Sequence, residues 1–229
     1  MKNDYNIDRI IDNFYSKGYT KFLNPKEFLL VKNRLPKRTQ NIYKPYNEAV
    51  KVIIYKKEIP NIIICKITFN SEVKHTMVLK GLFNLGLKED TFGDIIIMDN
   101  IAYIYLLEEL YDHVKYNYEL NKVSINSIDK VDKDFLKAYE PKFEKIELLV
   151  SSLRIDNVIS SITNDSRKSI ISRFKDNHIL LNYDIVKKND IYLKDGDVFS
   201  IRRIGKFRYN GIIKNTKKGG FIISIYKYI

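Results

Sequence analysis

Cationic side chains gather within one short predicted helix, in the segment NDSRKSIISRFKDNHILLN (164–182). They are Arg167, Lys168, Arg173 and Lys175. Asp165 or Ser166 is the predicted cap of this helix, since both side chains accept hydrogen bonds from a helix start. Guanidinium and ammonium groups beside the unpaired N–H groups of a helix start favour the binding of phosphate. The segment therefore predicts a phosphate-binding surface and no catalytic centre.

Further residues of the last third of the chain extend this predicted RNA-binding surface. Arg154 opens the preceding predicted helix, so Arg154 and Arg167 are expected to converge on adjacent phosphates of a folded RNA. The other predicted members are Ser166, Asn182, Lys187, Lys188, Arg202, Arg203, Lys206 and Arg208. Arg202 and Arg203 are expected on a strand, and Asp156 is expected to orient an arginine or cap a helix. Such contacts give salt-dependent affinity and carry little sequence information.

The charge of the chain supports a polyanionic partner. Among 229 residues there are 40 Lys+Arg and 28 Asp+Glu, a formal net charge of +12. Residues 151–229 hold 16 basic and 7 acidic residues, a net charge of +9. An excess of this size indicates nucleic acid or an anionic membrane surface.

Other features of the sequence bear on compartment and membrane binding. No apolar run approaches the ~18 to 20 residues that cross a bilayer, and the first residues do not resemble a signal peptide. The one cysteine, Cys65, lies in an apolar run and is expected to be buried without a disulfide. We therefore expect a cytoplasmic monomer with no membrane partner.

The sequence gives little support for a nucleotide-binding loop, a metal site or a catalytic nucleophile. The segment GLFNLGLK (81–88) has two glycines at the separation of a phosphate-binding loop but lacks its Gly-Lys-Ser/Thr ending, so Gly81 is expected to permit close packing. The three histidines stand apart from any ligand at metal-binding spacing, and no nucleophile elbow occurs. We expect no catalytic residue, no metal and no cofactor. Tyr103 and Tyr105 are expected in the core, with stacking on bases as the weaker alternative.

The hydrophobic pattern predicts an α+β protein. Residues 5–17 and 25–35 are predicted helices, and from residue 61 the order is β-α-β-β-α-β, the ferredoxin-like order shared by RNA-recognition motifs. Residues 129–142 form a predicted charged connector. The expected domains are an N-terminal helical region with a first strand (1–60), the RNA-recognition-motif-like domain (61–142) and a C-terminal domain ending in a hairpin (143–229).

The C-terminal segments LRIDNVI, SRKSIISRFKDNHILLN and LKDGDVFSIRRIGKF together resemble the S4 RNA-binding domain. The positions that carry the resemblance are Arg154-Ile155-Asp156, Ser166-Arg167, Leu181-Asn182 and Gly196-Asp197. With FLNP (22–25), residues 74–95 and the IRRIGKF strand, the similarity extends over nearly the whole chain to the YlmH family of bacterial S4-domain proteins.

This resemblance implies an N-terminal region, a central RNA-recognition-motif-like region and a C-terminal S4 domain. It also implies binding to rRNA of the large ribosomal subunit, next to peptidyl-tRNA. There the family acts in rescue of stalled translation, alongside the factor that adds alanine tails, and it is linked to cell-division gene neighbourhoods. The sequence departs from the family pattern at Lys44-Pro45 and Val50-Lys51, around Tyr46 and Ala49, and at Lys206, where the family has arginine.

Three hypotheses follow for function. The favoured one is a non-catalytic RNA-binding factor of the ribosome. The second is an RNA-modifying enzyme or its accessory, because S4 domains accompany pseudouridine synthases and methyltransferases; the chain lacks a glycine-rich methyl-donor loop. The third is a scaffold for division or membrane assembly, although no amphipathic membrane helix flanks the basic residues.

Overall fold

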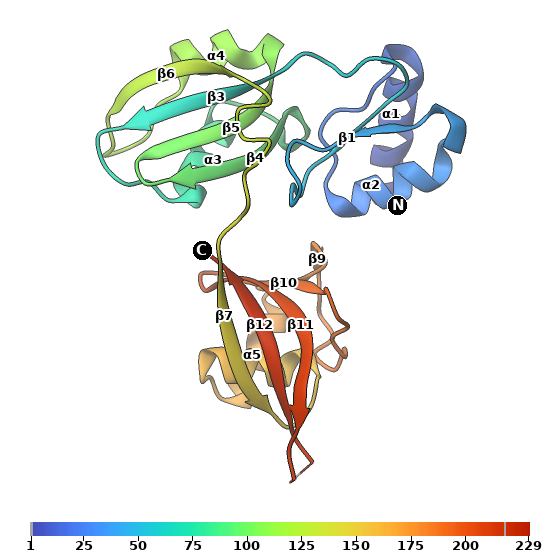
Figure 1. The fold of residues 1–229 in the computed structure, drawn as a ribbon, viewed down its shortest axis with the longest axis vertical. Coiled ribbons are helices and arrows are strands. Elements are labelled where there is room, and N and C mark those ends of the chain that lie inside the picture. The colour runs from blue at the N-terminus through green and yellow to red at the C-terminus, as the bar shows by residue number, and fades with distance from the viewer. Residues whose placement is uncertain (1, 218) are drawn as a thin grey trace. The chain divides into compact units, whose positions relative to one another are not determined.

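A computed structural model describes residues 2–217 and 219–229, together with their side chains except those of residues 2–6 and 167. The fold is of the predicted α+β class, with helices and several antiparallel sheets. The chain divides into two compact units, Met1–Glu140 and Pro141–Ile229 (Figure 1). Within the described residues, no helix combines the length and the apolar character of a membrane span.

The first unit begins with two helices and a small sheet. Its opening elements are α1 (Lys2–Lys17), α2 (Pro25–Arg34), the 3₁₀ turn η1 (Lys37–Thr39), β1 (Asn41–Tyr43) and β2 (Ile53–Tyr55). Asn24 caps α2: its side chain accepts from the Glu27 N–H at 3.0 Å, and the Glu27 carboxylate accepts from the Asn24 N–H at 3.2 Å. Val31 and Leu35 are buried on α2, whereas Leu29 is exposed, because it lies on the opposite side of the helix.

A four-stranded antiparallel sheet follows in the same unit. Its elements are β3 (Ile62–Phe69), α3 (His75–Asn84), η2 (Glu89–Thr91), β4 (Phe92–Met98), β5 (Ile101–Leu107), η3 (Glu108–Leu110), α4 (Tyr111–Asn117) and β6 (Ile125–Asp132). The strands lie side by side in the order β4-β5-β3-β6. Strand β6 runs into the predicted connector, because Val131 pairs with Ile64 and packs against the sheet.

Both faces of this sheet are covered by apolar side chains. One face packs against α3 and α4, and Cys65 is fully buried there, as predicted. The residues that cover the other face come from the N-terminal segment and from the stretch after β6. They include Phe22, Tyr46, Ala49, Ile53, Leu136 and Tyr139. The stretch predicted as a charged connector is therefore partly a packing element.

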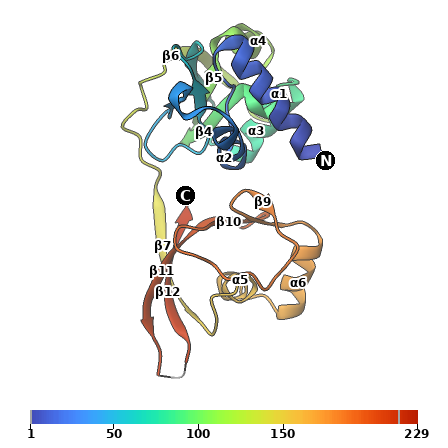
Figure 2. The same ribbon diagram turned by 90° about the vertical axis from the view of Figure 1, so that its right-hand side faces the viewer.

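The second unit is a six-stranded antiparallel sheet with two helices on one side (Figure 2). Its elements are β7 (Phe143–Val150), α5 (Ile155–Thr163), α6 (Arg167–Lys175), β8 (Ile179–Leu181), β9 (Asp184–Ile185), β10 (Val198–Ile201), β11 (Gly205–Asn215) and β12 (Phe221–Tyr228). The strand order is β7-β12-β11-β10-β8-β9. Ile159 of α5 and Phe174 of α6 pack against Phe207 and Ile225 of the sheet. The helices therefore cover one face of the sheet, and the other face carries half-buried and exposed side chains.

Two turns of the second unit form at residue types that tolerate a left-handed backbone. Asn177 and Gly196 adopt left-handed backbone conformations, with φ of 57° and 87°. The prediction that Arg202 and Arg203 lie on a strand was wrong. Strand β10 ends at Ile201, which pairs with Gly205, so the two arginines form the turn between β10 and β11.

Candidate nucleic-acid interface

Arg154 stands at the first turn of α5, where it is the N-cap residue. Its Nε donates to Oδ1 of Asp156 at 3.1 Å, and one terminal nitrogen donates to Oδ2 at 2.7 Å. The Asp156 side chain is only 8 % exposed, whereas that of Arg154 is 30 % exposed. The prediction that Asp156 orients an arginine is confirmed, and the outer edge of the guanidinium reaches solvent.

Asn189 completes this arrangement, which we call the Arg154 cluster (Arg154, Asp156 and Asn189). Its side-chain amide donates to Oδ2 of Asp156 at 2.7 Å, and its carbonyl accepts the Asp156 N–H at 3.3 Å. Burial works to raise the pKa of Asp156, but the bonds and charge of Arg154 and the bond from Asn189 outweigh it. The pKa of Asp156 therefore lies below its usual value, and the carboxylate is held ionised. Sequence reasoning missed Asn189, because nothing local connects it with a helix that begins more than 30 residues earlier.

The bonds of Asn189 tie its loop to the start of α5. Lys187 and Lys188 precede Asn189 in that loop and are exposed. Their ammonium groups therefore extend a positive surface from the Arg154 cluster. Ammonium groups on flexible stems act as point charges toward phosphate and leave the orientation of the ligand to the fixed guanidinium.

Helix α6 contributes the second part of the predicted surface. Ser166 caps it by accepting the Ser169 N–H at 3.3 Å, and Lys168 and Lys175 are exposed. Arg173 is held by Asp165, whose Oδ2 accepts from its Nε at 3.1 Å and from a terminal nitrogen at 2.9 Å. The Arg167 side chain lies outside the described residues, so its convergence with Arg154 stays a prediction.

Asn182 has a structural role within the second unit. Its side-chain amide donates to Oδ1 of Asp197 at 2.8 Å, and its side-chain oxygen accepts the Val198 N–H at 3.0 Å. Oδ2 of Asp197 accepts the Lys194 N–H at 2.8 Å. These bonds join the end of β8 to the turn before β10, which explains why Leu181-Asn182 and Gly196-Asp197 occur together.

Lys206 and Arg208 lie on the outer face of the six-stranded sheet, because they alternate with the buried Phe207 and Tyr209. The Lys206 Nζ stands 5.0 Å and 4.5 Å from the ring centres of Tyr183 and Tyr228, and it donates to the Tyr183 hydroxyl at 3.1 Å. The Arg208 guanidinium lies 4.7 Å and 5.6 Å from the rings of Phe143 and Tyr226. The predicted RNA-binding residues therefore do not all share one face.

The central sheet presents no open aromatic face. Tyr103 is 7 % exposed and stacks on Phe135, with ring centres 5.8 Å apart. Tyr105 is fully buried and stacks on Tyr46. The predicted core role of both tyrosines is confirmed, and the alternative that they stack on bases was wrong for the structure as it stands.

The segment that departs from the family pattern is fixed to the edge of this sheet. The Asp94 carboxylate accepts three bonds: from the Tyr46 hydroxyl at 2.7 Å and from the N–H groups of Val50 and Lys51 at 2.7 and 3.2 Å. The Lys51 ammonium donates to the carbonyls of Glu89 and Phe92 at 2.6 and 3.0 Å. Burial lowers the pKa of Lys51. Lys51 thus fastens this loop to the sheet.

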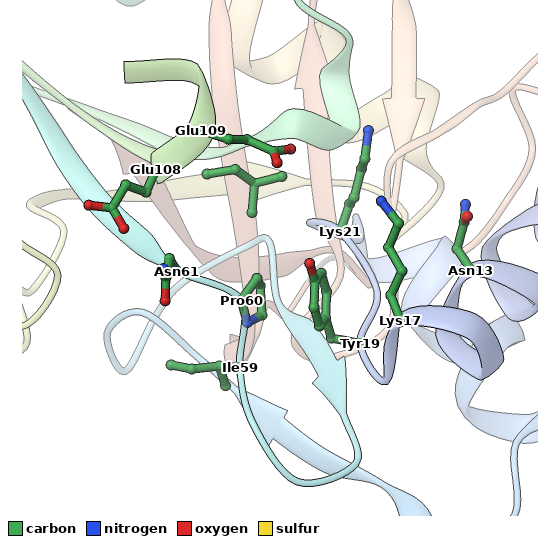
Figure 3. A pocket seen from close by; sticks show the side chains of 10 residues that line it. Asn13, Lys17, Tyr19, Lys21, Ile59, Pro60, Asn61, Glu108 and Glu109 are labelled. Carbon is green, nitrogen blue, oxygen red and sulfur yellow. The ribbon is translucent and has the colours of Figure 1, made fainter. Parts of the chain in front are cut away.

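A pocket of about 470 Å³ lies in the first unit (Figure 3). Lys17 and Lys21 come from the N-terminal segment, and Glu108 and Glu109 from η3, directly after β5. The carboxylates among the lining residues make the pocket unsuitable for a polyanion. Among the described residues no group of three or more His, Cys, Asp or Glu is placed to hold a metal ion.

Gly81 has the packing role that the sequence predicts. It lies within α3, and a Cβ at this position would stand 2.7 Å from the Tyr118 hydroxyl. That hydroxyl donates to the Val78 carbonyl at 3.1 Å, so the two elements contact each other closely. The segment 81–88 begins as a packed helix, and its first glycine serves the core.

Residues 58–134 match the family model described as "Putative RNA-binding domain in YlmH". This stretch of the chain is therefore similar to the YlmH family. It is 28 % identical over 146 residues to "Ribosome-associated protein quality control protein P2" of Bacillus subtilis (strain 168). That alignment covers 64 % of this chain and 57 % of the relative, so the chain spans little more than half the relative's length.

A solved structure of the same family name is also similar to the chain. It is "Cell division protein ylmH from Streptococcus pneumoniae", at 17 % identity and a TM-score of 0.40, covering 55 % of this chain and 86 % of that one. The YlmH match at 58–134 comprises β3 to β6 and their helices, and the Arg154 cluster lies outside it. The family match and the Arg154 cluster are therefore separate in the sequence.

Proposed function

We propose that the chain is a non-catalytic, cytoplasmic RNA-binding protein that acts on the large ribosomal subunit in rescue or quality control of stalled translation. Its ligands are rRNA and, next to it, peptidyl-tRNA. The YlmH match and the quality-control name of the Bacillus subtilis relative support the RNA and the ribosome in this proposal.

The Arg154 cluster is the observation that carries the proposal. A buried carboxylate fixes the guanidinium before any ligand arrives, so less side-chain entropy is lost when it binds a phosphate. Lys187 and Lys188 extend from the same loop, and residues 151–229 carry a net charge of +9. A fixed donor surrounded by mobile cations suits the recognition of folded RNA by its backbone.

The fold supports the same proposal. The order β4-β5-β3-β6, with α3 and α4 on one face, supports our proposal of a ferredoxin-like domain at residues 61–142, after an N-terminal region at 1–60. As part of the proposal, residues 143–229, in which α5 and α6 pack on the six-stranded sheet, form an S4 domain. We assign RNA binding mainly to this S4 domain, because the second face of the central sheet is covered.

Binding of variants to purified large subunits tests the proposal. Arg154→Ala and Arg167→Ala are each expected to weaken binding about tenfold at ~0.15 M salt, as expected for a lost charged hydrogen bond. Lys188→Ala is expected to have a smaller effect. The matched control is Lys137→Ala, an exposed lysine of the first unit outside the YlmH match.

Salt dependence separates a phosphate site from other causes. Each of the three variants should lower the slope of log affinity against log salt by about one, because one phosphate contact is lost. Variants that all bind as the wild type does, or a wild type that binds neither RNA nor the subunit, would contradict the proposal.

A further inference from the structure

Tyr192 is a large aromatic residue that the structure leaves 63 % exposed. It forms an isolated antiparallel bridge with Arg154. The Ile155 N–H donates to the Ile191 carbonyl at 2.8 Å, and the Leu193 N–H donates to the Leu153 carbonyl at 3.0 Å. The two segments are thus paired on both sides of Arg154 and Tyr192, which fixes their register.

This bonding pattern makes Arg154 and Tyr192 a non-hydrogen-bonded pair. Side chains of such a pair point to the same side, with Cβ atoms roughly 4.5–5.5 Å apart. The neighbours Ile191 and Leu193 pack toward the core of the second unit, so the alternation directs Tyr192 outward. The phenol ring therefore stands next to the fixed guanidinium.

Exposure alone assigns no function to a tyrosine. Tyr116 on α4 is even more exposed, at 75 %, and single exposed aromatic residues are common. What distinguishes Tyr192 is its partner: an arginine held by a buried carboxylate, with Lys187 and Lys188 in the neighbouring loop.

A second observation concerns the guanidinium. Arginine has five N–H donors, and two of them bond to Asp156. Within the part of the chain that the structure describes, no other hydrogen bond of this guanidinium occurs. A phosphate bound at its outer edge would bring the attached nucleoside to within reach of the Tyr192 ring, because sugar and base follow the phosphate directly.

We propose that Tyr192 stacks on an unpaired RNA base whose adjacent phosphate binds Arg154. This inference rests on the proposed function and specifies its ligand: RNA with a loop, bulge or single-stranded nucleotide. Bases within a continuous duplex are already stacked on both sides and offer the ring no face. Stacking of one base on an aromatic side chain corresponds to roughly 5- to 150-fold in affinity.

Two short RNAs with equal numbers of phosphates test the inference with the full-length chain. One is a hairpin with 2-aminopurine in an open loop, and the other is a blunt duplex. For the hairpin, Tyr192→Ala is expected to weaken binding at least fivefold and to abolish the fluorescence change of the loop base. For the duplex the same variant should bind within about twofold of the wild type.

Two further variants serve as controls for the loss of the hydroxyl group and for the loss of an exposed tyrosine in general. Tyr192→Phe retains the ring and is expected to bind the hairpin as the wild type does. If the hydroxyl group were the source of affinity, Tyr192→Phe would bind the hairpin as weakly as Tyr192→Ala. Tyr15→Ala removes an exposed tyrosine of α1, outside the YlmH match, and is expected to change nothing in RNA binding. Thermal unfolding of each variant identifies any that fail to fold.

The outcomes distinguish the inference from the proposed function. If Tyr192→Ala binds the hairpin normally while Arg154→Ala binds it weakly, the stacking inference is overturned and the proposed function stands. If Tyr192→Ala weakens hairpin and duplex equally, stacking is also overturned, because the ring then serves only the local structure. If the wild type binds neither RNA nor the large subunit, the proposed function itself is overturned.

Discussion

The ring of Tyr46 lies 6.1 Å from the ring of Tyr105, at an angle of 30° between their planes. Tyr46 belongs to the N-terminal segment, and Tyr105 is fully buried in strand β5. Tyr139, from the stretch after β6, packs against the edge of the same Tyr46 ring at 5.3 Å. Two segments far apart in sequence thus meet over the face of the central sheet.

This packing limits how the proposed RNA-binding role could use the central sheet, which lies in the YlmH match. RNA-recognition motifs stack bases on aromatic residues of their open sheet face. Here the corresponding tyrosines are covered by Tyr46, Phe135 and Tyr139, so that mode of binding would require the covering segments to leave. Contact with RNA through loops of this domain remains compatible with the packing.

Replacement of Tyr46 is expected to show how firmly the covering segment is held. Tyr46→Phe retains the ring but removes the bond from its hydroxyl to Asp94, and should cost about 1 kcal/mol in the free energy of unfolding. Tyr46→Ala also empties the space between Tyr105 and Tyr139 and should cost about 3–5 kcal/mol. Urea unfolding measures both.

The exposed Tyr15→Phe is the control for the Tyr46 variants, since it removes a hydroxyl at the surface and should leave stability within ~0.5 kcal/mol. Equal stability of Tyr46→Ala and the wild type would show that the covering segment contributes nothing to the fold.

Local chemistry made part of this fold predictable. The capping box at Asn24, the left-handed Asn177 and the turn at Gly196 depend only on residues near them in the sequence. The burial of Ile155 and Ile159 follows from helical periodicity in the same way. Such features need no knowledge of where distant segments lie.

Features that depend on contacts between distant segments could not be predicted from the sequence. Asn189 binds Asp156 from a loop, and Tyr192 pairs with Arg154, although neither belongs to a recognisable pattern. Arg202 and Arg203 were expected on the strand that follows the turn at Gly196. The pairing of Ile201 with Gly205 decides otherwise, and a pairing is not a local property.

Acid should weaken the Arg154 cluster in a way that depends on Asp156. Because the pKa of Asp156 is below its usual value in the folded chain, its ionised form stabilises the fold above the unfolded pKa of about 3.9. That contribution is lost as the pH falls through the lower, folded pKa. The stability difference between wild type and Asp156→Asn should therefore be largest near neutral pH and shrink below about pH 4.

Unfolding curves at several pH values measure this difference, with Asp12→Asn as a control on the exposed surface of α1. Asp156→Asn should also weaken RNA binding at neutral pH, because the guanidinium loses its fixed orientation. A stability difference that stays constant from pH 7 to pH 3 would exclude an ionised Asp156 as the source.

Replacement of Arg208 should lower the stability of the fold, whereas replacement of Lys188 should weaken RNA binding. The Arg208 guanidinium packs against Phe143 and Tyr226, so Arg208→Ala is expected to cost about 1–2 kcal/mol of stability. Lys188 is exposed in its loop, so Lys188→Ala should leave stability unchanged and weaken RNA binding. Thermal unfolding and binding at ~0.15 M salt, measured on the same samples, separate the two effects. The reverse pattern would place Arg208, and not Lys188, at the RNA.

Cys65 should be unreactive as long as the chain is folded. It is fully buried in β3, and burial raises the pKa of its thiol to about 12. At pH 8 almost none of it is thiolate, and no reagent reaches it without opening of the first unit. A disulfide reagent such as Ellman's should therefore modify the native chain at least a thousandfold more slowly than the urea-unfolded chain.

Because α3 and α4 cover this face of the sheet, the rate of Cys65 modification reports on opening of that packing. Gly81→Ala forces a Cβ against Tyr118 and should therefore accelerate the modification. Rapid modification of the native wild type would show that the sheet is not closed on this side.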